Sequence, residues 1–145
     1  EWWELVKVGG VLFFTIPDED LYEQGIFPSL SNPDHKATFT ISKTKSWSPV
    51  SVNVLDLAQS LPNSKIVSLA LQDYKYNRKL MVFGPRLKSN KMINFIIRVY
   101  FFIKKKLHIN KNIWIIEDLI RLFKPTDQTS GEALAQIQCI VRKTS

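Results

Sequence analysis

Short apolar runs alternate with longer polar stretches along the chain, and the first of these runs is the clearest. Residues 11–16, Val-Leu-Phe-Phe-Thr-Ile, form a continuous apolar run with β-branched and aromatic residues that ends at Pro17. Such a run is typical of a strand buried on both faces, as in a parallel sheet covered by helices. Residues 1–7 have the pattern of a helix end, and Gly9-Gly10 breaks it where the backbone must turn.

The rest of the pattern predicts an alternation of helices and strands. Val52, Leu55 and Leu57 recur at helical spacing, and Ser51 can cap a helix, so we expect a helix over 51–61. The other expected elements are a short strand at 37–41 inside a turn-rich loop at 18–49, a strand at 65–72 and a strand at 133–141. This order suits a single α/β domain over residues 1–145, and a loop of that length usually carries function.

Residues 74–130 interrupt the alternation and are expected to form a helical insert. Residues 92–103 are almost entirely apolar, and three lysines follow at 104–106, which suits the carboxyl end of a helix. A second amphipathic helix at 113–123 is expected to pair with the first. The apolar run is too short to cross a bilayer, which needs about twenty residues. Two interpretations stay open: a core or cap helix, and an interfacial helix lying on an anionic membrane.

The net charge is +7, and the positive charge is concentrated in the insert. No acidic residue occurs between Asp73 and Glu117. That stretch holds Lys75, Arg78, Lys79, Arg86, Lys88, Lys91, Arg98, Lys104, Lys105, Lys106 and Lys111. Such a block indicates a surface that meets a phosphate, a nucleic acid or an acidic membrane, although a solvated lysine-rich surface has the same pattern. Aromatic residues interleave with the cations, as on nucleic-acid-binding surfaces, but no recognised nucleic-acid motif accompanies them.

Cysteine and histidine usage limits the possible chemistry. Cys139 is the single cysteine, which excludes an intramolecular disulfide, and its apolar surroundings predict a buried thiol. A reducing, cytoplasmic setting fits this usage. The two histidines and the cysteine lie far apart and lack the ligand spacing of a zinc site. The chain also lacks a Gly-x-Ser-x-Gly elbow and a phosphate-binding glycine-rich loop.

Residues 1–17, EWWELVKVGGVLFFTIP, resemble the helix-turn-strand of class I S-adenosylmethionine-dependent methyltransferases. The turn in that family is often Leu-Lys-Pro-Gly-Gly, and Val8 replaces its proline here. Residues 18–25 and 32–40 resemble a bacterial subgroup of methyltransferase domains, and 132–143 resemble its last strand. The resemblance covers residues 1 to about 73 and 127–143, and it leaves the basic insert unexplained.

The resemblance implies a Rossmann-like α/β sheet of seven strands, with the last strand antiparallel to the others. The strands at 11, 65 and about 133 would be the fifth, sixth and seventh, so the chain would be the carboxyl-terminal portion of such a domain. The family binds S-adenosylmethionine through a glycine-rich loop after its first strand and an acidic residue that ends its second. Neither element is found in this chain, so we expect the chain alone to be inactive and to bind the cofactor poorly.

The candidate catalytic residues lie in the loop after the first strand. His35 is the best candidate for a general base, because an ordinary imidazole titrates near neutral pH. Either Asp34 or Glu23 could orient its ring. The alternative for His35 is a loop histidine bonded to the backbone. Ligands of open α/β sheets bind beyond the carboxyl ends of the strands.

Acceptor-binding candidates surround these residues. The carboxylates that follow the strand, Asp18, Glu19 and Asp20, could reach the crevice, although Asp18 could instead cap a turn. Tyr22, Phe27 and Trp47 could form an apolar wall, or could be ordinary loop packing. Lys36 and Lys45 could meet a phosphate on the acceptor, or could be solvated.

Two functions from different classes follow from these patterns. The first is transfer of a methyl group to an unidentified acceptor, for which the basic apolar insert suggests a glycan or a lipid-linked sugar, at the cytoplasmic side of the inner membrane. The second is a non-catalytic module that binds an anionic membrane or a nucleic acid through residues 75–111; a remnant without function is a third reading. We also expect oligomerisation through an open sheet edge, because unpaired strand edges pair with other chains.

Overall fold

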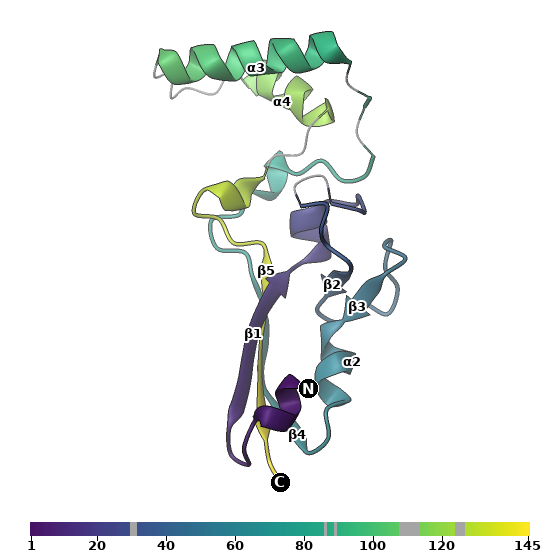
Figure 1. Cartoon of the computed structure of the whole chain (residues 1–145). Helices are drawn as coiled ribbons and strands as arrows, with labels where there is room; N and C mark the ends of the chain where they lie inside the picture. Colours follow the sequence, from purple (N-terminus) through teal and green to yellow (C-terminus); the bar gives the residue numbers. More distant parts are fainter. Residues whose placement is uncertain (30–31, 86, 89, 108–113, 124–126) are drawn as a thin grey trace.

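The computed structural model describes residues 1–29, 32–85, 87–88, 90–107, 114–123 and 127–145, and it shows a mixed α/β protein (Figure 1). Its elements in chain order are α1 (Trp2–Leu5), β1 (Val11–Pro17), the π-helical turn η1 (Glu19–Glu23), β2 (Thr38–Thr40), β3 (Ser51–Asn53), α2 (Val54–Gln59), β4 (Ser64–Gln72), the 3-10 turn η2 (Arg78–Leu80), α3 (Lys91–Lys106), α4 (Trp114–Phe123), the 3-10 turn η3 (Gln128–Ser130) and β5 (Gln136–Lys143).

The main sheet contains three strands in the order β1-β5-β4. β5 pairs antiparallel with both neighbours, so β1 and β4 run in the same direction on either side of it. Cys139 lies opposite Phe14 on one side and opposite Leu69 on the other. The predicted strands at 11–16 and 65–72 are confirmed, and the last strand begins three residues later than predicted.

The hydrophobic core lies on one face of this sheet. Ile137, Cys139 and Val141 of β5 are fully buried against Val54 and Ala58 of α2, and Trp3 of α1 closes the same cluster. The indole Nε1 of Trp3 donates a hydrogen bond to the carbonyl of Pro62 at 2.9 Å. The prediction of a buried Cys139 thiol is therefore confirmed, and burial raises its pKa.

The opposite face of the sheet is open. Val11 and Phe13 of β1 are 51% and 56% exposed, while Leu12, Phe14 and Ile16 alternate with them and pack on the core. The prediction that this strand is buried on both faces is therefore wrong. The strand is buried on one face only because α1 and α2 both pack on the core side of the sheet, and no described element covers the other side.

The helix predicted over 51–61 begins later and is shorter. Residues 51–53 instead form β3, which pairs in parallel with β2. The side-chain oxygen of Asn53 accepts hydrogen bonds from the backbone N–H groups of Leu55 and Asp56, at 3.0 and 3.3 Å, so Asn53 caps α2. An asparagine cap satisfies the first free amides of a helix at least as well as serine does. The hydroxyl of Ser51 is used elsewhere, as described below.

The insert leaves β4 and returns to β5 through a hydrogen-bonded stem. The N–H of Leu134 donates to the carbonyl of Tyr74 at 2.9 Å, and the Gln128 side chain bonds both backbone groups of Asn77. Lys75 and Glu132 form an ion pair beside them. Beyond this stem, α3 and α4 stand clear of the sheet end (Figure 1).

The two helices of the insert contact each other, as the sequence predicts. Ile93, Ile97 and Tyr100 of α3 and Ile116 and Phe123 of α4 line a shared apolar groove. No residue of α3 is buried, so the interpretation of this segment as a core helix is wrong, and a cap or an interfacial helix remains. Position 113, the predicted start of the second helix, lies outside the described residues. Within the described part of the chain, no helix has the length and apolar character needed to cross a membrane.

Candidate functional site

The polar residues after β1 are arranged by a cap at Asp18. Its carboxylate accepts hydrogen bonds from the N–H groups of Asp20 and Leu21, at 3.1 and 3.0 Å, and starts the turn η1. Burial raises the pKa of Asp18, and the charge of Asp20 raises it further. The backbone hydrogen bonds lower the pKa but do not outweigh these effects. The turn-capping role considered for Asp18 is therefore present, and it fixes the direction in which Glu19 and Glu23 point.

His35 and Glu23 form a close pair at the centre of the site. Nδ1 of His35 lies 2.6 Å from Oε1 of Glu23, whose side chain is only 2% exposed. Of the two predicted partners of His35, Glu23 is the one that contacts the ring. A carboxylate on Nδ1 fixes the ring and leaves Nε2 to exchange a proton with a ligand. The pair is joined by the Tyr22 ring, whose centroid lies 5.4 Å from that of His35.

The second carboxylate oxygen of Glu23 is buried and has no hydrogen-bond partner among the described residues. Buried polar atoms in proteins are nearly always hydrogen-bonded, and an unpaired one needs a specific explanation. The oxygen belongs to a cavity-lining residue. This combination makes the pair a candidate functional site and not only a structural contact.

The cavity at this pair has a volume of about 310 Å³. Its lining is Pro17, Glu23, Asp34, His35, Lys36, Ala37 and Phe39. The structure therefore brings four predicted site residues together, Glu23, Asp34, His35 and Lys36, at the carboxyl end of β1. A second cavity of about 390 Å³ shares Pro17 and is lined by Tyr22 and by the segment 131–136. Burial raises the pKa of Tyr22, and the nearby charges of Asp127 and Glu23 add to this.

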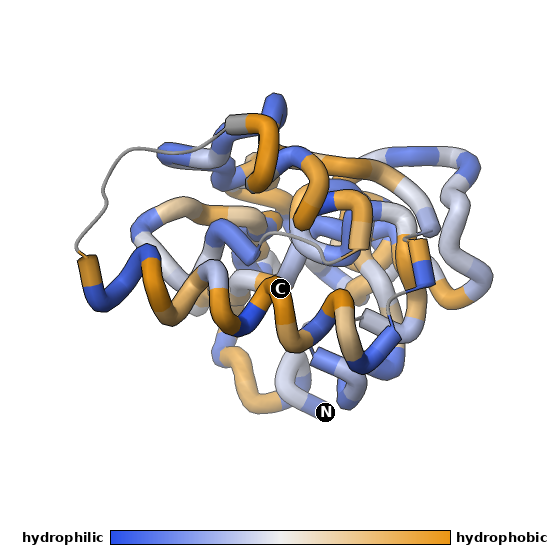
Figure 2. Tube along the Cα trace, turned by 90° about the horizontal axis from the view of Figure 1, so that it is seen from above, coloured by the Kyte–Doolittle hydropathy of each residue, from blue (hydrophilic) through white to orange (hydrophobic). Residues whose placement is uncertain are grey.

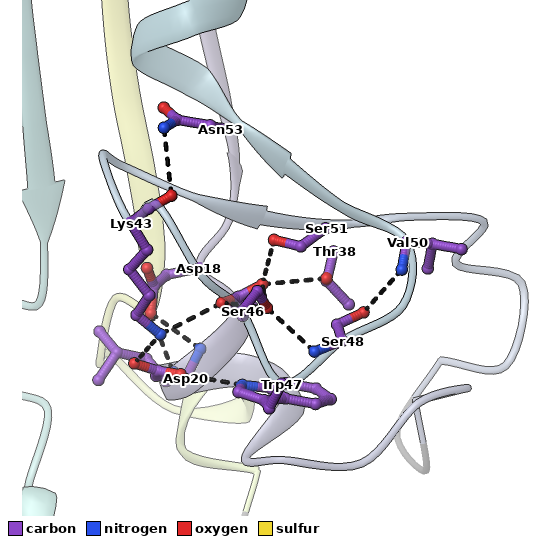
Figure 3. A network of polar contacts seen from close by, with 12 residues as sticks. Asp18, Asp20, Thr38, Lys43, Ser46, Trp47, Ser48, Val50, Ser51 and Asn53 are labelled. Atoms are coloured by element: carbon purple, nitrogen blue, oxygen red, sulfur yellow. Dashed lines mark hydrogen bonds and ion pairs between the residues drawn. The ribbon is translucent and has the colours of Figure 1, made fainter.

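Glu19 is the centre of a separate polar network (Figure 3). It is fully buried, and its carboxylate accepts hydrogen bonds from the hydroxyls of Ser51 (2.6 Å), Ser46 (2.8 Å) and Thr38 (3.1 Å) and from the Lys43 ammonium (3.2 Å). Burial alone would raise the pKa of Glu19, but these hydrogen bonds outweigh it and lower the pKa. Both oxygens of this carboxylate accept hydrogen bonds, and these bonds connect the loop between β2 and β3 to η1.

Asp20 and Trp47 belong to this network and not to the His35 cavity. The Asp20 carboxylate accepts from Trp47 Nε1 at 3.1 Å and forms an ion pair with Lys43 at 2.6 Å (Figure 3). The Trp47 ring meets the Phe83 ring edge-on at 5.9 Å. Trp47 thus joins the loop to the start of the insert, while Lys45 is exposed and Phe27 half-buried.

Sequence reasoning missed Lys43, Ser46 and Ser51, which supply most of the Glu19 network. Each of these residues lies 24 to 32 positions from Glu19 in the sequence, so no local sequence pattern indicates the contact. A weak signal existed in the acidic residue that directly follows a strand and must be paired if it is buried.

No group of three or more His, Cys, Asp or Glu residues in the described part is placed to hold a metal ion. The described residues offer an imidazole held by a carboxylate at a cavity whose surface is mainly apolar.

Comparison of the chain with protein-family models, with curated proteins and with solved structures finds no match. The candidate site therefore stands on its own geometry and on the sequence motifs.

Proposed function

We propose that this chain forms the carboxyl-terminal portion of a class I S-adenosylmethionine-dependent methyltransferase domain. The observation that carries the proposal is the sheet: β1 and β4 run parallel, and β5, the last strand, is antiparallel to both. The resemblance requires this direction of the fifth, sixth and seventh strands. The helix, turn and strand at residues 2–17 support the same assignment.

The unfilled apolar surfaces also support a partial domain. An apolar groove of about 600 Å³ between β1 and α2 is lined by Trp2, Leu12, Phe14 and Leu57, among others. The outer edge of β1 carries no described strand. Further strands of a larger sheet would pair with this edge and cover the groove.

In the proposed enzyme, His35 acts as the general base toward the methyl acceptor. An acceptor hydroxyl must lose its proton when oxygen is methylated, and Nε2 of His35 takes up that proton. Glu23 bonded at Nδ1 keeps the ring oriented and stabilises the imidazolium that forms, as the carboxylate does in a catalytic triad. Lys36 and Asp34 are exposed and line the same cavity, and in the proposed enzyme they bind polar groups of the acceptor.

The acceptor proposed from the setting of this cavity is a glycan or a lipid-linked sugar. The lining of the cavity combines the apolar residues Pro17, Ala37 and Phe39 with four polar or charged side chains, a combination that suits a sugar ring. The basic insert adjoins the same end of the sheet. These features also support a place at the cytoplasmic face of the inner membrane.

The experiment that tests the proposal is calorimetric titration with S-adenosylhomocysteine, the spent cofactor. We expect no heat from the chain alone at high micromolar ligand, and clear binding by a protein extended with the residues encoded directly upstream. His35→Ala in the extended protein is expected to keep this binding and to lose methyl transfer to a glycolipid extract by about 100-fold or more. Absence of binding by the extended protein would exclude the proposed class, whereas binding by the chain alone would move the cofactor site into the described residues.

A further inference from the structure

The outer face of α3 exposes large apolar side chains that α4 does not cover. Met92, Phe95, Ile96, Phe102 and Ile103 are 65%, 67%, 57%, 65% and 46% exposed. The spacing of Met92, Phe95, Phe102 and Ile103 puts them on one side of the helix. Ile96 lies at the border of this side, because it also lines the groove shared with α4. In Figure 2 the trace of α3 is hydrophobic over most of its length, with hydrophilic segments at intervals.

A stripe of cations borders this apolar face. Lys91, Arg98 and Lys105 recur at heptad spacing, so they share one side of α3, and Lys106 follows at its end. All four side chains are exposed. Lys79 and Lys88 add exposed charge nearby in the chain, while Arg86 and Lys111 lie outside the described residues. No acidic residue occurs in the sequence from 74 to 116, so nothing within the segment offsets this charge.

We propose that α3 lies flat on a bilayer that contains anionic phospholipid, with its apolar face in the acyl boundary and its cationic stripe among the headgroup phosphates. A helix of 16 residues is about 24 Å long, too short to span the hydrocarbon core but suited to its surface. The positive stripe supplies the charge complementarity that selects anionic lipid. A nucleic acid could use the cations and the rings of Phe95 and Phe102, but it does not explain the exposed aliphatic side chains of Met92 and Ile103, on which no base can stack.

The position of the hairpin relates this surface to the His35 cavity. The backbone N–H of Gly84, at the start of the insert, donates to the carbonyl of Gln24 at 2.8 Å, directly after the turn that carries Glu23. Docking of α3 therefore holds the cavity close to the headgroup layer. That last step rests on the proposed function, whereas the binding of α3 to lipid does not depend on methyl transfer.

Co-sedimentation of the chain with vesicles tests the proposal. We expect binding to phosphatidylcholine vesicles that contain phosphatidylserine, no binding to phosphatidylcholine alone, and release by added salt. The variant R98Q/K105Q/K106Q should weaken partitioning by about fivefold for each cation removed. The matched variant K7Q/K65Q/R142Q removes as many charges from exposed positions on the sheet portion, and it should bind as the parent does. The variant F95S/F102S should lose binding even at low salt.

Four outcomes would overturn the inference. Equal binding to neutral vesicles would show that charge does not contribute to binding. Equal weakening by the two charge variants would show that binding depends on the net charge of the protein and not on the cations of α3. Tighter binding to a polynucleotide than to vesicles, lost in R98Q/K105Q/K106Q, would assign the surface to nucleic acid. Self-association without lipid that disappears in F95S/F102S would assign the apolar face to a second copy. Circular dichroism of each variant keeps loss of helix separate from loss of binding.

Discussion

Glu19 and Glu23 leave the same helical turn and are both buried, yet their hydrogen-bond environments differ. Each oxygen of Glu19 has donors, from three hydroxyls and an ammonium. Glu23 has His35 on one oxygen and no described partner on the other. A satisfied buried carboxylate adds stability, whereas an unsatisfied one costs free energy. We therefore assign Glu19 to the stability of the loop and Glu23 to function.

Replacement of Glu19 tests its assignment to stability. Glu19→Gln removes the charge that four donors surround, so we expect the free energy of unfolding to fall by about 3 kcal/mol. Urea denaturation measures the change. Glu4→Gln is the control, because the Glu4 side chain is 83% exposed and should change stability by less than about 0.5 kcal/mol. An unchanged midpoint for Glu19→Gln would contradict the network.

The lowered pKa of Glu19 makes a pH-dependent contribution. Because its folded-state pKa lies below the ordinary value of 4.5, Glu19 stabilises the fold fully above that value. The contribution is lost as pH falls through the lower, folded-state pKa. We expect the unfolding free energy of the parent to fall more steeply with acid than that of Glu19→Gln. The raised pKa of Asp18 has the opposite sign but is common to both proteins, so it cancels in the difference. Parallel curves would contradict the prediction.

The ring state of His35 follows from its contact with Glu23. We expect the neutral ring to carry its proton on Nδ1, where it donates to Glu23, and the ¹⁵N chemical shifts of the neutral ring report this directly. Glu23→Gln should shift the population toward a mixture of tautomers, since an amide can either donate or accept. The variant His108→Gln assigns the signals. A parent ring protonated on Nε2 would contradict the proposed base.

At this scale the sequence predicted the His35 pair but not the Glu19 network. His35 was identifiable because imidazole is the side chain that titrates near neutral pH, and Glu23 and Asp34 lie in the same loop. The network depends on three hydroxyls that become neighbours only when β2 and β3 pair. Serine and threonine are so common in loops that their presence in the sequence does not predict these hydrogen bonds.

At the scale of elements, apolar pattern predicted where strands and helices occur, but not what covers them. The run at 11–16 is compatible with burial on one face or on two, because the composition of a strand does not record its neighbours. The helix start was misplaced for a different reason. Ser51 and Asn53 are both good helix caps, but Ser51 lies in β3, which pairs with β2, so the helix begins after Asn53.

The approach of the loop to the insert depends on a glycine. Gly25 has φ +81°, and a Cβ there would lie 2.7 Å from the Gly84 nitrogen and 2.9 Å from the Phe83 ring. We expect Gly25→Ala to separate the two segments and to speed hydrogen exchange of the Gly84 amide, which donates to Gln24. Gly9→Ala is the matched control: it has φ +78° but an added Cβ would meet nothing within 4 Å, so only the backbone cost of about 1 kcal/mol applies. Equal effects of the two variants would contradict the close approach.

At the scale of the whole molecule, the open sheet face and the outer edge of β1, which pairs with no described strand, favour association. Exposed apolar strands at an edge are sites for pairing with another chain. We expect the chain to self-associate at high concentration, and Phe13→Lys to reduce this by placing a charge on the open face. Val8→Lys adds the same charge at an exposed turn residue outside the strands and should leave association unchanged. Light scattering measures both, and a monomeric parent at high concentration would contradict the prediction.

The central position of β5 also dictates when the sheet can form during synthesis. Val11 pairs with Arg142, so the first and last strands of the chain are neighbours, and β1 and β4 meet only through β5. Contacts so distant in sequence form late and slowly, whereas the hairpin of α3 and α4 is local and can form early. The three described strands of the main sheet therefore cannot pair with one another before β5 is synthesised, whereas β2 and β3 are close in sequence and can pair earlier. Until β5 is synthesised, β1 and β4 lack the strand that pairs with both of them, and exposed apolar strands of this kind favour aggregation.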